Sequence, residues 1–211
     1  MESNDEMVDR LVERGIIESD RVEQAFRNVD RKDFVPEPHK DKAYADTPLP
    51  IAGGSVTSQP SVIAENTELL DVGENDRVIE IGSGSGYQVA LLAELTDGEV
   101  IGVDIIEEVI ENSRERLDYD NVKILHGNGF NPVEGEFDRI LYSCAIDSFD
   151  EARRHLTEDG IIVAPVYVDH GQVLRKYEKG EITDHSPVRF MPFEEEDEGP
   201  ELPEEYREEN L

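Results

Sequence analysis

The chain has 211 residues, which is long enough for one sizeable hydrophobic core and short for two. Its formal net charge of −31, from 51 acidic against 20 basic residues, argues against nucleic acid as a partner, because phosphate binding needs a clustered basic surface. Its single cysteine, Cys144, excludes an intramolecular disulfide, and no segment approaches the ~18 apolar residues of a membrane span, so we expect a cytoplasmic protein that does not enter membranes.

Two short amphipathic helices are expected at the start of the chain, followed by a long irregular loop. Apolar residues gather on one face over 7–17, and again over 22–29 after the pair Ser19-Asp20. Residues 30–50 then contain four prolines and lead into the sequence AYADTPLPIAGGSVTSQP. A loop of this length inside a compact domain is usually functional or disordered, and its many apolar residues favour a functional loop.

This loop ends at Ser58, immediately before Gln59 and a predicted helix over 60–70. Pro60 suits the first turn of that helix. Ser58 therefore lies at a helix N-terminus, where backbone N–H groups and the helix dipole favour a carboxylate. The local pattern leaves two interpretations open: a hydroxyl that binds a carboxylate, and a simple helix cap.

The most informative stretch is RVIEIGSGSGYQVALLAE, at residues 77–94. It predicts a buried strand, a turn with three alternating glycines and a helix. A dinucleotide-binding turn has its third glycine at the sixth position, which here is Tyr87, and the carboxylate of Glu80 would repel a pyrophosphate. S-Adenosylmethionine (SAM) has no phosphate and carries a sulfonium and an ammonium group. The pattern resembles the first motif of Rossmann-like SAM-dependent methyltransferases; the alternative is an ordinary strand-to-helix turn of another α/β protein.

The remainder of the chain alternates predicted strands and helices, which is typical of a mostly parallel sheet with helices on both faces. Asp104 ends the strand after the glycine turn, where its carboxylate could accept both ribose hydroxyls of an adenosine or simply cap the next helix. The turn around Asn128 lies at the sheet edge where the adenine would lie. We expect strands at 100–103, 122–125, 137–142 and 160–165, helices at 106–117 and 151–156, and a C-terminal antiparallel hairpin of strands near 173–178 and 185–190.

The chain closes on EEEDEGPELPEEYREENL, residues 194–211, which we expect to be a solvated and largely disordered tail. Acidic residues are also spread along the whole chain. That distribution is typical of a protein from a high-salt cytoplasm, where salt screens self-repulsion; a solvated acidic surface without halophily is the alternative. The five histidines show no metal-ligand spacing, so no metal site is expected.

Over nearly its whole length, to about residue 193, the chain resembles protein-L-isoaspartate (D-aspartate) O-methyltransferases. Glycine turns are shared by many methyltransferases, whereas the PLPI…SQP loop joined to a closing VRFMP strand is specific to this family. The matching segments are RKDFVP at 31–36, AYADTPLPI at 43–51, TSQP at 57–60, VIEIGSGSGYQ at 78–88, GNG at 127–129, FDRI at 137–140, GIIVAPV at 160–166 and VRFMPF at 188–193.

The resemblance implies transfer of a methyl group from SAM to the free carboxylate of L-isoaspartyl or D-aspartyl residues, which starts the repair of damaged proteins. Ser58 matches the family's active-site serine and would hold that carboxylate. The implied cofactor-binding residues are Glu80, Gly82, Ser83, Gly84, Gly86, Tyr87, Asp104, Ile105, Asn128 and Gly129, and the implied substrate-binding residues are Ala52, Val56, Thr57, Val188 and Phe190.

In this interpretation residues 1–60 form N-terminal helices and a substrate loop packed on a SAM-binding domain of residues 61–193. We expect a monomer whose partners are isoaspartyl-containing proteins and peptides. Three departures from the family pattern bear on the substrate: Val56-Thr57 in the loop, Asn128 in place of an aspartate, and Ile146-Asp147 in place of a proline-rich segment. A diverged methyltransferase acting on another substrate and a non-catalytic SAM-binding adaptor therefore stay open as alternatives.

Overall fold

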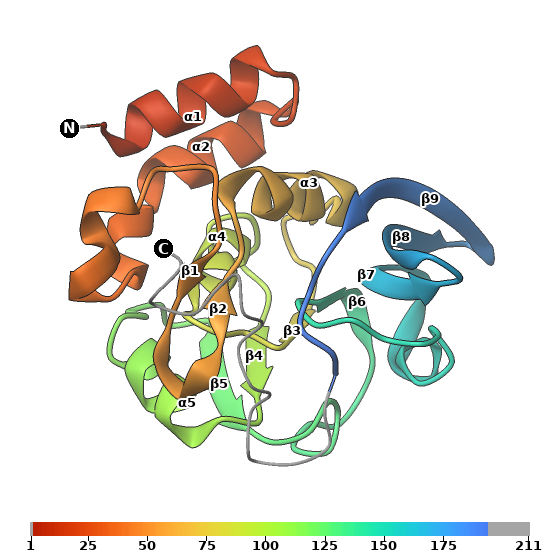
Figure 1. The fold of residues 1–211 in the computed structure, drawn as a ribbon. Helices are drawn as coiled ribbons and strands as arrows, with labels where there is room; N and C mark the ends of the chain where they lie inside the picture. Colours follow the sequence, from red (N-terminus) through yellow and green to blue (C-terminus); the bar gives the residue numbers. More distant parts are fainter. Residues whose placement is uncertain (1, 194–211) are drawn as a thin grey trace.

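One seven-stranded sheet organises the molecule, with strand order β5-β4-β3-β6-β7-β8-β9 (Figure 1). The computed structural model describes residues 2–193; the acidic segment 194–211, for which we expect a solvated tail, lies outside them. Strands β3, β4, β5, β6 and β7 run parallel to one another, whereas β8 pairs antiparallel with both β7 and β9. The strands are β3 Val78–Ile81, β4 Val100–Asp104, β5 Val122–His126, β6 Phe137–Tyr142, β7 Leu156–Val168, β8 Gly171–Glu178 and β9 Glu181–Val188.

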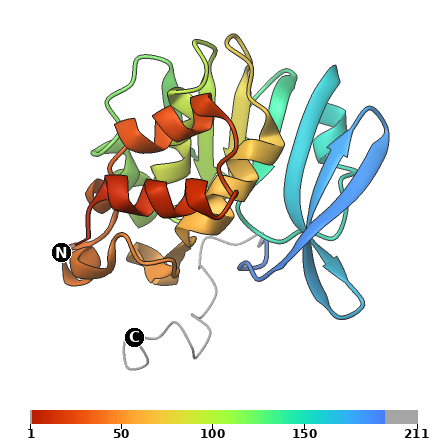
Figure 2. The ribbon, with the colours of Figure 1, turned by 90° about the horizontal axis from the view of Figure 1, so that it is seen from above.

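Helices cover one face of this sheet in two layers. Helices α3, α4 and α5 contact the strands, α2 contacts α3 and α4, and α1 packs on α2; Figure 2 shows α1 and α2 side by side on the outside. These helices are α1 Asn4–Glu13, α2 Asp20–Asn28, α3 Pro60–Leu70, α4 Tyr87–Ala93 and α5 Glu107–Arg114. Within residues 2–193 no helix is long and apolar enough to cross a membrane.

Capping chemistry sets the ends of the first two helices. Helix α1 begins earlier than the apolar pattern predicts, because Ser3 and Glu6 form a reciprocal capping box. It ends before Gly15, whose φ of +66° is a left-handed conformation that terminates helices. Helix α2 starts as expected, with the Ser19 side chain accepting from the backbone N–H of Val22.

The other face of the sheet is covered by a short 3-10 helix, η4 (Ala152–His155), and by loop side chains. Phe130 and Phe149 pack there in a second core with Phe137 of β6 and Ala152 of η4. The sequence predicts a helix over 151–156, but only one 3-10 turn forms before β7 begins at Leu156. Helices are therefore present on both faces in unequal measure.

The C-terminal hairpin has the expected antiparallel pairing, but its second strand has different bounds. Strand β9 starts at Glu181 rather than 185, because Lys179 and Gly180 form a tight turn with φ values of +49° and +86°. Most residues of β9 are exposed, so no alternation of apolar and polar side chains marks its bounds in the sequence. The chain leaves the sheet after Val188, and residues 189–193 run beside the loop after β6.

The long N-terminal loop is more regular than expected. It contains the 3-10 helices η1 (Arg31–Phe34), η2 (Glu37–Lys42) and η3 (Ala52–Gly54), and a short hairpin of β1 (Leu49–Pro50) and β2 (Val56–Thr57). The tip of this hairpin lies over the glycine turn and the start of α5: a Cβ added at Gly53 would meet Ile106, and one at Gly84 would lie 3.6 Å from Ile51. The loop therefore covers the turn that follows β3.

The parallel strands converge on a single point that suits a ligand. Strand β3 lies between β4 and β6. The sheet therefore extends through β4 and β5 on one side of β3 and through β6 and β7 on the other. Ligands of open α/β sheets bind at the carboxyl ends of the strands at such a switch point. Ile81 pairs with Val103 and with Tyr142, which brings the residues after all three strands together.

Candidate active site

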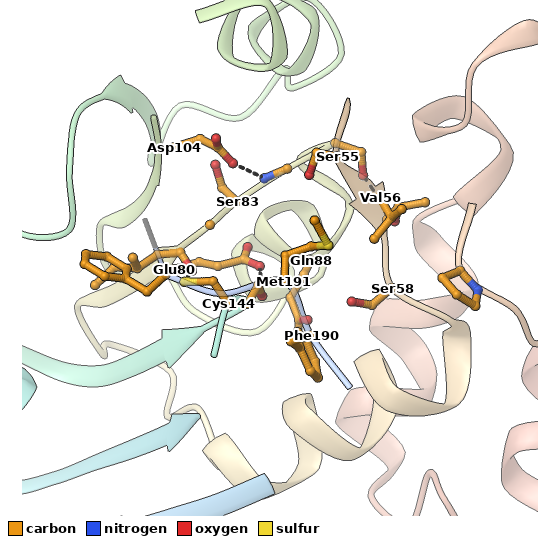
Figure 3. A pocket seen from close by; sticks show the side chains of 18 of the residues that line it. Ser55, Val56, Ser58, Glu80, Ser83, Gln88, Asp104, Cys144, Phe190 and Met191 are labelled. Atoms are coloured by element: carbon orange, nitrogen blue, oxygen red, sulfur yellow. Dashed lines mark hydrogen bonds between the residues drawn. The ribbon is translucent and has the colours of Figure 1, made fainter. Parts of the chain in front are cut away.

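A cavity of about 450 Å³ opens at the carboxyl ends of β3, β4 and β6. The glycine turn and Asp104 border one end, and the loop before α3 and the segment after β9 border the other (Figure 3). Of the residues implied by the family resemblance, the cavity is lined by Val56, Thr57, Ser58, Glu80, Gly82, Ser83, Gly84, Asp104, Ile105, Gly129, Val188 and Phe190.

The turn after β3 presents backbone rather than side chains to the cavity. Gly82 and Gly84 have φ values of +82° and +51°, a region that non-glycine residues rarely adopt. The N–H of Gly82 donates to the carbonyl of Val103 at 2.8 Å, which fixes the turn on β4. A ligand can therefore lie directly against the main chain at this end of the cavity.

Glu80, near the end of β3, is a buried carboxyl with one oxygen unoccupied. Its Oε1 accepts a hydrogen bond of 2.6 Å from the Ser143 hydroxyl, whereas its Oε2 is buried without a partner within residues 2–193. Burial raises the pKa of Glu80 to about 8, with the Ser143 hydrogen bond opposing the shift and Asp104 adding to it. The hydroxyl of Ser83 is also buried without a partner. Buried polar atoms are normally paired, so both groups indicate a bound polar ligand.

Asp104 ends β4 and faces the same part of the cavity (Figure 3). Its Oδ2 accepts from the N–H of Gly84 at 2.9 Å and its Oδ1 from the N–H of Ile106 at 3.1 Å. Burial raises the pKa of Asp104, while these backbone hydrogen bonds oppose the shift. Each carboxylate oxygen has two lone pairs, so Asp104 keeps acceptor capacity for hydroxyl groups of a ligand.

Ser58 lies at the opposite end of the cavity, between β2 and α3. Its carbonyl accepts a hydrogen bond of 2.9 Å from Arg31, and its hydroxyl has no partner among the described residues. The N-cap of α3 is Gln59, whose side chain forms no cap hydrogen bond, and the N–H of Ser61 in the first turn donates to Asp46 rather than to Ser58. The helix-cap interpretation of Ser58 is therefore wrong, and its hydroxyl is available to a ligand.

The wall facing Ser58 is the segment that follows β9. Gln172 of β8 holds it by donating to the carbonyl of Phe190 at 3.0 Å and accepting from the Phe190 N–H at 2.6 Å. The N–H of Ala145 donates to the carbonyl of Met191 at 2.7 Å. Val188, Phe190 and Met191 thus form an apolar surface opposite the Ser58 hydroxyl.

Four of the implied site residues do not line this cavity. The Tyr87 ring is buried on the other side of the turn, 6.2 Å from the Phe26 ring and 5.6 Å from the Phe34 ring, so its side chain does not line the cavity and its role as a cofactor contact stays a prediction. Gly86 packs against α5, where an added Cβ would meet Ser113 and Leu117. Ala52 and Asn128 line neighbouring cavities.

Sequence reasoning missed several residues that shape the site. Three of them form hydrogen bonds to site residues that lie far away in the sequence: Ser143, Gln172 and Arg31. Ser143 and Glu80, for example, are 63 positions apart, a separation that leaves no local signal. Cys144 also lines the cavity, but burial raises its thiol pKa, so it remains protonated and is no nucleophile. Within residues 2–193 no cluster of side chains is suited to a metal ion.

The geometry therefore joins a cofactor end, made of backbone and two carboxyl groups, to an acceptor end with a free hydroxyl. A Rossmann-like sheet with this arrangement at its switch point defines the class of SAM-dependent methyltransferases.

Comparisons with known proteins agree with this class and narrow it. The model of the protein-L-isoaspartate(D-aspartate) O-methyltransferase family matches residues 2–198. The protein-L-isoaspartate O-methyltransferase of Methanopyrus kandleri is 40% identical over 205 residues, 90% of this chain and 91% of the relative. That of Ignicoccus hospitalis is 37% identical, covering 93% and 99%. The structure of a Plasmodium falciparum protein-L-isoaspartate O-methyltransferase with S-adenosyl-L-homocysteine has a TM-score of 0.82 at 27% identity, covering 92% and 99%. The chain belongs to the protein-L-isoaspartate(D-aspartate) O-methyltransferase family.

Proposed function

We propose that this protein transfers a methyl group from SAM to the free carboxylate of L-isoaspartyl or D-aspartyl residues in damaged proteins, which initiates their repair. The observation that carries the proposal is the unpartnered Ser58 hydroxyl, which lines the same cavity as Glu80 and Asp104. Family membership supports the same activity. The cofactor is SAM, and isoaspartyl-containing proteins are the substrates.

The residues at the cofactor end fit SAM. The unpartnered Oε2 of Glu80 suits the ammonium group, Asp104 retains acceptor capacity for the ribose hydroxyls, and Ile105 and Gly129 border the space for the adenine. The backbone of Gly84 leaves no side chain in the way. When bound, SAM supplies an electrophilic methyl group on its sulfonium.

Methyl transfer to a carboxylate requires little acid–base catalysis from the protein. An isoaspartyl carboxyl group is already ionised at neutral pH, so no strong general base is needed. Ser58 donates a hydrogen bond to that carboxylate and directs one oxygen toward the cofactor end. Positioning of this kind replaces a bimolecular encounter by a nearly unimolecular step. The chain's own contribution is orientation, and neither Cys144 nor Glu80 is required to move a proton.

We propose that the peptide flanking the isoaspartate lies between Val56-Thr57 and the segment after β9. Val188 and Phe190 supply apolar surface there, which keeps water from the reacting oxygen. Ala52 lies at the tip of the hairpin, outside this groove, so we assign it no contact with the reacting residue.

We further propose that the protein works as a monomer in a salt-rich cytoplasm. The net charge of −31 supports this setting, because high salt screens the repulsion that such a charge creates.

The decisive experiment is a methylation assay with labelled SAM in concentrated KCl, comparing an isoaspartyl peptide with its normal aspartyl twin. We expect label in the isoaspartyl peptide alone, as a base-labile methyl ester. Equal labelling of both peptides would contradict specificity for isoaspartate. Tight SAM binding without labelling of either peptide would instead favour a diverged methyltransferase or an adaptor.

A further inference from the structure

Arg31 is a fully buried arginine that does not line the cavity, yet it contacts the loop that carries Ser58. Its side chain has a relative exposure of 0%. One terminal nitrogen donates to the carbonyl of Ala43, and the other donates to Ser58 at 2.9 Å and to Thr47 at 3.4 Å. One guanidinium thus connects three separate points of the loop between η2 and α3.

No carboxylate in residues 2–193 forms an ion pair with this guanidinium, although Asp46 lies near enough to favour its charge. Burial lowers the pKa of Arg31 to about 10, so it remains protonated at neutral pH. Its Nε has no hydrogen-bond partner in the described part of the chain. A buried charge without a counter-ion is costly, so the hydrogen bonds of this guanidinium to the carbonyls of Ala43, Thr47 and Ser58 are what compensate for its burial. The charged side chain therefore fixes the path of the loop that carries Ser58.

A second anchor fixes the chain on the other side of Ser58. Asp46, from the same loop, accepts from the N–H of Ser61 at 2.9 Å, in the first turn of α3, and from Arg14 at 2.8 Å. The carbonyl of Ser58 is held by Arg31 and the helix that follows is held by Asp46. The hydroxyl of Ser58 is the group left free between these two anchors.

We propose that Arg31 is a positioning residue for methyl transfer: by binding the Ser58 carbonyl it sets the direction in which the Ser58 hydroxyl meets the acceptor carboxylate. This inference rests on the proposed function, because it assigns Ser58 to the acceptor. It predicts an effect on the peptide half of the reaction only, since Arg31 touches none of the residues at the cofactor end.

The test is a double-mutant cycle with Arg31→Met and Ser58→Ala, measuring kcat and KM for an isoaspartyl peptide and SAM affinity by calorimetry. Arg31→Met should lower kcat/KM about tenfold or more, with SAM affinity within about threefold of wild type. In the Ser58→Ala background, Arg31→Met should lower kcat/KM by no more than about threefold further, because both changes remove the same interaction. Arg31→Lys, which keeps the charge but not the fork of nitrogens, should recover part of the activity.

Arg21→Met is the matched control, because Arg21 also binds two carbonyls, those of Val72 and Leu95, neither of which belongs to the loop that carries Ser58. It should lower the melting temperature without lowering kcat/KM per folded molecule. If Arg31→Met does not fold, the cycle is run with Arg31→Lys. The positioning role would be overturned if Arg31→Met lowered kcat/KM by the same factor in the Ser58→Ala background as in wild type. It would also be overturned if Arg21→Met lowered kcat/KM as much as Arg31→Met does. A wild-type protein that does not methylate the peptide would refute the proposed function and the role of Arg31 with it.

Discussion

Glu80 is the residue at which the site's electrostatics are most unusual. Its carboxyl is buried, and its pKa of about 8 means that it is largely protonated at neutral pH until a cation lies beside it. This state follows from the position of Glu80 in β3, an inner strand between β4 and β6 whose side chains are all buried. The fold therefore keeps an uncharged acid at the point where we propose that the ammonium group of the cofactor binds.

This shift predicts a pH dependence of stability for the ligand-free protein. Because the folded pKa of about 8 lies above the ordinary value of 4.5, the contribution of Glu80 is fully present below about pH 4.5 and is lost as the pH rises through about 8. Denaturant unfolding between these pH values should show a falling free energy of unfolding in wild type and a smaller fall in Glu80→Gln. Glu111→Gln, on the exposed side of α5, should retain the wild-type slope. Identical slopes in wild type and Glu80→Gln would contradict the assignment.

Single residues were predictable from sequence where their partners are local. Gly82, Gly84 and Asp104 belong to one strand-turn-helix-strand unit, so their spacing already indicates a shared ligand. Tyr87 follows that turn directly, yet its ring faces the hydrophobic core, because the first residue of α4 can point to either side. Nothing in the local sequence distinguishes these two directions.

At the scale of elements, the glycine turn is the part of the cofactor end most sensitive to substitution. Gly84→Val places a side chain at the cavity, in a backbone conformation with φ of +51°. Calorimetry should find no measurable SAM binding to this variant while circular dichroism shows a folded protein. Gly15→Val is the control, because Gly15 has a similar φ of +66° with no neighbour within 4 Å of the added Cβ. Wild-type SAM affinity in folded Gly84→Val would sink the assignment of this turn.

Loosening the segment after β9 should weaken binding of the peptide substrate and leave SAM binding unchanged. Gln172→Ala removes both hydrogen bonds that hold the main chain of Phe190. We expect KM for the isoaspartyl peptide to rise about three- to tenfold, as for the loss of about one net hydrogen bond, with SAM affinity unchanged. Gln24→Ala, on the exposed surface of α2, is the control. A KM that stays at the wild-type value would show that this wall does not contact the peptide.

Elements were predictable where periodicity or caps mark them, and less so where tertiary contacts decide. The buried strands and the start of α3 at Pro60 follow from apolar runs and a proline. Strands β1 and β2 have two residues each and η4 has four, too few for any period to show. The two hydrogen bonds that hold the main chain of Phe190 come from Gln172, which is 18 positions away in a strand that carries no distinguishing pattern.

At the scale of the whole molecule, acidic residues are spread along the chain, and the resulting negative charge predicts that stability of the fold requires salt. The Debye length is ~10 Å at 0.1 M and ~3 Å at 1 M ionic strength, so repulsion within a net charge of −31 is far weaker at the higher value. Surface ion pairs such as Lys40–Glu37 weaken as well, but solvent already screens exposed pairs, so they contribute little to stability. The melting temperature should therefore climb steeply with KCl between these concentrations. A flat profile would count against adaptation to high salt.

Ser58, which we propose holds the acceptor carboxylate, offers the most direct test of the proposed function. A hydrogen bond to a charged group contributes about 1.5–3 kcal/mol, so Ser58→Ala should lower kcat/KM for an isoaspartyl peptide roughly 10- to 150-fold. SAM affinity and melting temperature, measured on the same preparation, should stay at wild-type values, because the hydroxyl contacts neither the cofactor end nor the N-terminus of α3. Ser148→Ala, at an exposed position, controls for the loss of a hydroxyl elsewhere. Unchanged kcat/KM in folded Ser58→Ala would contradict the account.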